Sequence, residues 1–183
     1  MSTTSPLLID RIETPVGEVA IVADEAGRLH ALGFSDGHRR MEEHLEVSAQ
    51  RLGNALVPKK NPGGLSAALR RYFSGDLAAI EGLPVVMEGT EFQRSVWRAL
   101  CEIPCGETRS YAEIARRIGN PAAVRAVGLA NGRNPIGIVV PCHRVIGANG
   151  TLTGYGGGIE RKRWLLAHEN ALPKSAQLEL AAT

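Results

Sequence analysis

Residues 110–134, "SYAEIARRIGNPAAVRAVGLANGRN", predict two short helices joined by a tight turn. A capping box at residues 110–113 opens the first helix, which Gly119 closes. Asn120 then predicts the cap of a second helix, with Pro121 at its first position. Two helices this close in sequence predict helix-turn-helix geometry.

The second of these helices has the composition of a DNA-contacting helix. Arg125 projects from its middle among small side chains such as Ala122, Ala123 and Ala126. Small residues let a helix approach DNA closely, and the arginine could then enter a groove or the base stack. Alanine and glycine are equally common where two core helices pack on each other, so this alternative stays open at this point.

The composition is that of an ordinary globular protein with loose ends. The chain has 183 residues, of which 44% are hydrophobic and 22% charged. No secretion signal or bilayer-spanning stretch is readable, so we expect a cytoplasmic protein without membrane contact. The three cysteines make an odd count, which favours free thiols over a disulfide framework.

The Gly- and Pro-containing stretch at residues 81–92 separates two parts of different character. Residues 7–34 alternate short apolar runs with turn signals, which predicts an antiparallel β-meander. Helices are predicted over 38–52 and 64–76, and a further one runs from a Thr90 cap towards Pro104.

The last predicted helix covers residues 158–170. We therefore expect an α+β fold, in which an N-terminal antiparallel sheet with helices is followed by a mostly helical domain. The expected boundaries are 1–86 for an α/β scaffold domain, 87–172 for the second domain and 173–183 for a flexible tail.

Charge is divided unevenly between these parts. The net charge of the whole chain is +2, but residues 1–90 carry 9 Lys/Arg against 12 Asp/Glu, whereas residues 91–183 carry 12 against 7. The second part, at +5, is the one suited to a polyanion. Basic residues that only keep a surface hydrated would give the same count.

Residues 138–147, "IVVPCHRVIG", place a cysteine and a histidine side by side in an apolar stretch. A cysteine in such surroundings is more often an inert core residue than a nucleophile. His143 changes this balance because it could accept the thiol proton of Cys142, either across a bend made by Pro141 or through water. Glu169 is one candidate to orient the imidazole.

Two other chemistries compete for these residues. A zinc ion could be bound by the three cysteines and the histidine, Cys101, Cys105, Cys142 and His143. However, adjacent residues such as Cys142 and His143 seldom bind one ion, and the usual Cys-x-x-Cys spacing is absent. A cysteine hydrolase would use the same nucleophile and base, yet no oxyanion-hole signature is readable.

The stretch "NPIGIVVPCHRVIG" resembles the active-site signature of the O6-alkylguanine-DNA alkyltransferases. The resemblance extends through "FQRSVWRALCEIPCGETRSYAEIARRIGNPAAVRAVGLANGRNP" and "LTGYGGGIERKRWLLAHEN" and so covers nearly all of residues 90–170. In the first half, "TPVGEVAIVADEAGRLHAL" is the best match. An ordered series of motifs over this length is highly specific.

The resemblance implies that an alkyl group passes once, irreversibly, from O6 of guanine in duplex DNA to Cys142. O4-alkylthymine as a second substrate stays open. By the same resemblance His143 and Glu169 accept the thiol proton, and Asn134 braces the turn beneath the active site. A tyrosine at the position of Tyr111 assists rotation of the nucleotide out of the helix and protonation of the leaving guanine.

The resemblance also implies the surfaces that hold DNA and the base. Arg125 is the expected arginine finger that fills the vacated place in the base stack, on a helix lying in the minor groove. The remaining expected DNA contacts are Ala123, Ala126, Gly128 and Tyr111. The expected pocket for the base is formed by Val145, Tyr155, Gly156 and Gly157. Arg144 favours a structural ion pair over a phosphate contact.

The resemblance further implies no cofactor and no metal, and we expect a monomer; cooperative binding of several chains on DNA stays open. Where some family members have a pocket serine, this chain has Gly156, and where some have a proline, it has Gly137. A sister group that recognises alkylated DNA without repairing it replaces the acceptor cysteine, so the presence of Cys142 favours the enzyme over this alternative.

Overall fold

The computed structural model describes residues 5–35, 55–174 and 176–177, which belong to two compact units. The first unit spans Met1–Met87 and the second Glu88–Thr183. The division therefore falls within the Gly- and Pro-containing stretch at residues 81–92. Across the described part of the chain, no helix is both long and apolar enough to cross a bilayer.

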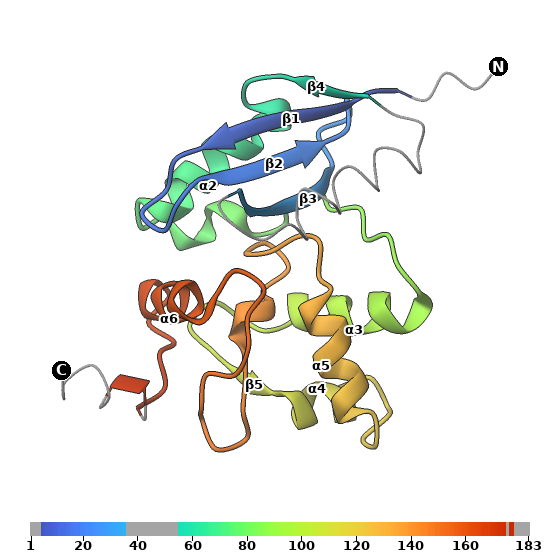
Figure 1. Cartoon of the computed structure of the whole chain (residues 1–183), viewed down its shortest axis with the longest axis vertical. Coiled ribbons are helices and arrows are strands. Elements are labelled where there is room, and N and C mark those ends of the chain that lie inside the picture. The colour runs from blue at the N-terminus through green and yellow to red at the C-terminus, as the bar shows by residue number, and fades with distance from the viewer. Residues whose placement is uncertain (1–4, 36–54, 175, 178–183) are drawn as a thin grey trace. The chain divides into compact units, whose positions relative to one another are not determined.

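The first unit is built on a four-stranded sheet with the strand order β3-β2-β1-β4 (Figure 1). The predicted antiparallel meander is confirmed, and it consists of β1 (Leu7–Ile12), β2 (Val19–Ala23) and β3 (Leu29–Phe34). The fourth strand, β4 (Leu56–Pro58), runs parallel to β1 at the edge of the sheet. The sheet is therefore mixed, and not purely antiparallel as expected. The short parallel strand β4 was not predicted.

Helix α2 (Leu65–Phe73) lies against this sheet (Figure 1) and corresponds to the helix predicted over 64–76. Its buried Leu65, Leu69 and Tyr72 are spaced by four and three residues, so they form one apolar stripe. Two 3₁₀ turns flank it, η1 (Pro62–Gly64) and η2 (Leu77–Ile80). The helix predicted over 38–52 lies outside the described residues.

A close contact between two turns fixes one end of the sheet. Gly27 belongs to the turn between β2 and β3, and Gly63 belongs to η1. A Cβ atom on Gly63 would lie 2.5 Å from the Gly27 Cα, and the φ angles of the two residues are +59° and +78°. Only glycine satisfies both the spacing and the positive φ here.

The second unit begins with two helices that each start with a capping box, of which the box at Ser110 and the cap at Thr90 were predicted. In α3 (Glu91–Cys101), Thr90 is the N-cap and exchanges hydrogen bonds with Gln93. In α4 (Tyr111–Arg117), Ser110 does the same with Glu113. Both boxes satisfy backbone N–H groups that a helix start leaves unpaired.

The predicted start of the next helix is wrong by three residues. Helix α5 (Val124–Gly132) has Ala123 at its N-cap, and Asn120 does not cap it. Instead the Ala123 N–H donates to the Asn120 carbonyl over 3.0 Å, so Pro121 lies in a tight turn before the helix. Helices α4 and α5 contact each other, and their docking on DNA as a helix-turn-helix stays a prediction.

The cysteine segment is held between short elements at the centre of this unit. Strand β5 (Arg109–Ser110) pairs in parallel with β6 (Val145–Ile146). Directly before β6, the chain forms the 3₁₀ turn η3 (Cys142–Arg144). Further along the chain lies helix α6 (Ile159–His168). Cys142 and His143 therefore lie on a tight turn, and not on a bent strand.

Candidate active site

Cys142 is buried with only 7% of its surface exposed, in a turn that Asn134 holds in shape. The Asn134 side chain donates to the Val140 carbonyl over 2.7 Å and accepts from the Ile136 N–H over 2.9 Å. Within the same loop Ile138 has a φ of +68°, which is strained for a β-branched residue. The side chain of Asn134 thus joins both ends of a loop that would not keep this shape alone.

His143 is fully buried beside Glu169, with 3.0 Å between the imidazole Nε2 and the carboxylate Oε1. Burial lowers the pKa of His143 more than the hydrogen bond with Glu169 raises it, so the ring is neutral near pH 7. In a neutral ring that donates from Nε2, the other nitrogen is a free base. Within the described residues, Nδ1 of His143 has no hydrogen-bond partner.

Arg144 completes this buried group by donating to both oxygens of the Glu169 carboxylate. Its Nε and Nη2 atoms donate to the two carboxylate oxygens over 2.8 and 2.9 Å, and Nη1 donates to the Ile103 carbonyl over 2.8 Å. Burial raises the pKa of Glu169, but the hydrogen bonds from His143 and Arg144 outweigh this effect and hold it far below its usual range. Glu169 is therefore ionised, and Arg144 forms the predicted structural ion pair.

The thiol of Cys142 is subject to opposing effects. Burial raises its pKa, whereas a hydrogen bond from Asn134 and the positive charge of Lys162 lower it, and the net pKa is above the ordinary value. The resting side chain is thus a thiol that must lose its proton to react. A neutral imidazole in the next residue is the kind of base this step requires.

Lys162 is a member of this site that the sequence reading missed. It lies on α6, is fully buried, and donates to the carbonyls of Val145 and Thr153 over 2.5 and 2.9 Å. Burial lowers its pKa to about 8. In the sequence it stands between two arginines, Arg161 and Arg163, and only its position on the inner face of α6 distinguishes it from them.

Of the residues predicted to form the base pocket, Tyr155 lies near Cys142. Val145 is buried in β6, three residues after the cysteine. Burial raises the pKa of Tyr155 well above 10, and the nearby Cys142 adds to this effect. Arg161 donates to the Gly157 carbonyl over 3.2 Å, and a Cβ on Gly156 would meet nothing within 4 Å. The loop is therefore held by a hydrogen bond at Gly157, and at Gly156 there is free space where a side chain would begin.

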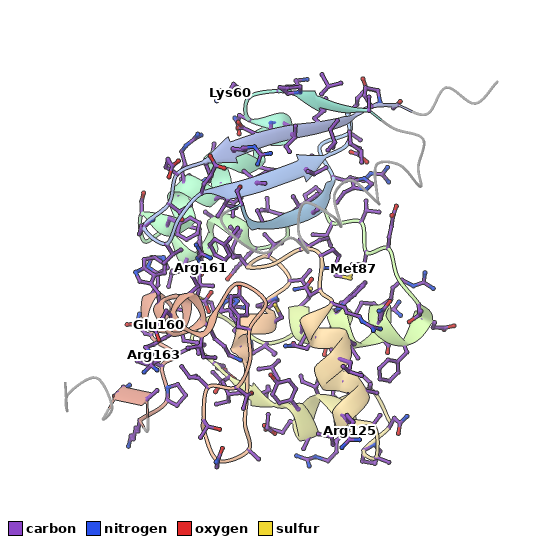
Figure 2. All side chains as sticks on the ribbon, in the orientation of Figure 1. Lys60, Met87, Arg125, Glu160, Arg161 and Arg163 are labelled. Atoms are coloured by element: carbon purple, nitrogen blue, oxygen red, sulfur yellow. The ribbon has the colours of Figure 1, made fainter. Side chains whose placement is uncertain are left out.

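Tyr111 is the first residue of α4 and lies beside α5, the helix that carries Arg125. The Tyr111 hydroxyl accepts a hydrogen bond from Thr153 over 3.2 Å, and its ring passes within about 4 Å of where a Gly128 side chain would begin. Arg125 and Ala126 are exposed and Ala123 is half-buried. Figure 2 shows Arg125 near the start of α5, on the outer surface of this unit.

The described residues include no group of three or more His, Cys, Asp or Glu side chains that could hold a metal ion. Cys101 is exposed and Cys105 is partly exposed, whereas Cys142 is buried. The three described cysteines are free thiols.

Comparison with known proteins identifies the chain. Residues 8–87 match the family model described as 6-O-methylguanine DNA methyltransferase, ribonuclease-like domain, and residues 91–171 match the DNA binding domain of the same protein. The methylated-DNA–protein-cysteine methyltransferase of Shigella flexneri is 50% identical over 91% of this chain and 97% of its own length. That of Methanosarcina mazei is 48% identical over 86% and 94%.

A solved structure agrees with these relatives. The crystal structure of Mycobacterium tuberculosis OGT in complex with DNA matches with a TM-score of 0.75 and 43% identity, over 93% of this chain and 97% of that one. The similarity extends over both units and includes the segment that holds Cys142. The chain therefore belongs to the methylated-DNA–protein-cysteine methyltransferase family.

Proposed function

We propose that this protein repairs O6-alkylguanine in duplex DNA by moving the alkyl group onto the sulfur of Cys142. The observation that carries the proposal is the buried Cys142 beside His143, a neutral base that is hydrogen-bonded to an ionised Glu169. The thiol of Cys142 becomes a nucleophile when it loses its proton, and the neutral His143 is the group that can accept this proton.

The reaction needs one bond to form and one to break at the alkyl carbon. Among the described residues, no direct hydrogen bond joins the Cys142 thiol to His143, so the thiol proton passes through a water molecule to Nδ1 of His143, and Glu169 stabilises the resulting imidazolium through Nε2. The thiolate attacks the alkyl carbon, the bond from that carbon to O6 breaks, and guanine leaves as an anion. Tyr111 is the proposed donor that protonates the leaving base. The thioether product has no good leaving group, so each chain reacts once.

A buried thiol reaches an atom inside the base stack only if the nucleotide is extruded. We assign the arginine finger to Arg125, because its side chain extends from an exposed helix into solvent. The exposed or half-buried small residues around it, Ala123, Ala126 and Gly128, let the helix approach a groove closely. The pocket for the extruded base is assigned to Val145, Tyr155, Gly156 and Gly157.

We infer that the protein acts in the cytoplasm, where bacterial and archaeal DNA is found, and that the first unit serves as a scaffold. Each hydrogen-bond partner named above for His143, Glu169, Asn134 and Lys162 lies in the second unit. The alternative, a protein that binds alkylated DNA without reacting, is less favoured because the curated relatives are methyltransferases and Cys142 is present.

The test is to incubate the full chain with excess duplex that contains one O6-methylguanine and to follow methylation by peptide mass spectrometry. A single methyl group is expected on the Cys142 peptide, and none in a Cys142→Ala variant. A Cys101→Ala variant is the matched control, since it removes a thiol that is exposed. Tight binding of the duplex without methylation of Cys142 would instead support the recognition protein.

A further inference from the structure

The exposed face of α5 carries large apolar side chains that nothing in the site described so far uses. Among the described residues, the large hydrophobic side chains with the greatest exposure are Val57 at 40%, Val124 at 37% and Leu129 at 58%. Two of the three are on α5, the helix that carries Arg125. A leucine exposed to this extent indicates a contact surface when it adjoins other binding residues.

Leu129 follows Arg125 by four residues, so the two side chains lie on the same face of α5, one turn apart. The opposite face is packed into the unit through Val127 and Ala130, and the Ala130 carbonyl accepts from the Trp97 indole over 2.9 Å. Leu129 therefore points away from the core on the face that Arg125 also uses.

The charge of this helix restricts what could cover the leucine. Residues 124–133 contain two arginines, Arg125 and Arg133, and no acidic residue. Both arginines are exposed, and no hydrogen bond or ion pair within the described residues engages Arg125. An apolar side chain between two free positive charges suits a groove of DNA, whose phosphates lie outside and whose sugars present apolar walls.

We propose that Leu129 is a DNA-positioning residue that packs against the sugar walls of the minor groove, one helical turn from the arginine finger. This inference rests on the proposed function and extends it. Small residues bring the helix close to the duplex, and Leu129, the most exposed of the large apolar side chains named above, then supplies an apolar contact one turn from Arg125. Such a contact stabilises the opened minor groove of a kinked duplex. Its free energy does not depend on counterions.

Leu129→Ala tests this proposal, with Val57→Ala as the matched control because Val57 is also exposed but lies in the first unit. Binding of a duplex is measured in a Cys142→Ala background over a range of salt concentrations. We expect Leu129→Ala to weaken binding about tenfold with an unchanged salt slope, and Arg133→Gln to weaken it with a smaller slope. Leu129→Met should retain wild-type affinity, and Val57→Ala should change nothing.

A second measurement distinguishes a DNA contact from damage to the site. Transfer from free O6-benzylguanine, which needs no DNA, should proceed at the wild-type rate in Leu129→Ala. Equal duplex binding by wild type and Leu129→Ala would overturn the proposal, as would loss of self-association in the variant, which would assign the leucine to a second copy of the chain. If wild type failed to react with any alkylguanine, the proposed function would fall, yet the effect of Leu129 on duplex binding would remain measurable.

Discussion

Glu169 determines the charge of the buried group around Cys142. It accepts hydrogen bonds from both His143 and Arg144, and its side chain is fully buried. The sequence predicted both the pairing with His143 and the structural role of Arg144. It could not predict that one carboxylate serves both, because that depends on how α6 lies against η3.

Replacing Glu169 by glutamine should destabilise the second unit in a pH-dependent way. The pKa of Glu169 is lower in the folded chain than the unfolded value of 4.5, so its contribution is fully present above pH 4.5 and is lost as the pH falls below it. We expect a loss of about 3–5 kcal/mol at pH 7, shrinking by about 1.4 kcal/mol per pH unit below 4.5. Urea unfolding at several pH values measures it.

The matched control for this change is Glu160→Gln, because Glu160 is on the same helix and is largely exposed. Its effect should stay within about 0.5 kcal/mol at every pH. A difference between wild type and Glu169→Gln that is the same at pH 7 and pH 3 would contradict the ionised state assigned to Glu169.

Lys162 should tune the reactivity of Cys142. Its positive charge favours the thiolate, so Lys162→Met should raise the pKa of the Cys142 thiol and slow its alkylation by iodoacetamide at pH 7. Since the pKa of Lys162 is about 8, wild type loses this charge at higher pH, and the two rates should converge above it. Peptide mass spectrometry separates Cys142 from the other two thiols.

Arg163→Met provides the comparison for Lys162, because it removes a neighbouring positive charge that is not among the groups acting on Cys142. Its alkylation profile should match that of wild type. If Lys162→Met and Arg163→Met behaved alike, the charge effect assigned to Lys162 would be wrong.

At the scale of elements, the sequence predicted best what is determined locally. The Thr90 cap, the capping box at Ser110 and the β-meander turns depend on residues within four positions of one another, and they were predicted correctly. The start of α5 was wrong because Asn120 and Pro121 fit a turn as well as a helix start. Strand β4 and the bridge between Leu29 and Val85 were missed because pairing between distant segments leaves little local pattern.

The two capping boxes of the second unit allow a test of what α4 positions. Ser110→Ala and Thr90→Ala each remove one N-cap, and each should lower the free energy of unfolding by about 1 kcal/mol. Tyr111 is the first residue of α4, so we expect only Ser110→Ala to slow methyl transfer from duplex DNA as well. Rapid-quench kinetics measure the rate of methyl transfer for each variant, under conditions in which both variants are fully folded.

Equal slowing by Ser110→Ala and Thr90→Ala would assign the loss to general destabilisation of the unit. Transfer from free O6-benzylguanine adds a further check. This small substrate needs no rotation of a nucleotide but still releases a guanine that Tyr111 protonates, so Ser110→Ala should slow this transfer less than it slows transfer from duplex DNA.

The whole molecule divides into two units whose sequences differ in charge and in kind. The acidic first unit contains the mixed sheet, and the basic second unit contains the cysteine, its buried partners and the exposed helix α5. The uneven charge, the helix signals and the signature around Cys142 predicted from the sequence that the second part carries the reactive cysteine and the first part is a scaffold. The buried contacts of Lys162 depend on the packing of the unit and became visible only in the structure.

Because the hydrogen-bond partners named above for the active-site residues lie in the second unit, damage to the first unit should lower the free energy of unfolding but leave the rate of methyl transfer nearly unchanged. Gly63→Ala would place a Cβ 2.5 Å from the Gly27 backbone at a positive φ, whereas Gly82→Ala has a similar φ and nothing within 4 Å. We expect Gly63→Ala to cost about 3 kcal/mol and Gly82→Ala about 1. At a temperature where both variants are folded, by circular dichroism, each should methylate Cys142 at the wild-type rate. A transfer rate that falls with Gly63→Ala in the folded protein would instead make the first unit a participant in the reaction.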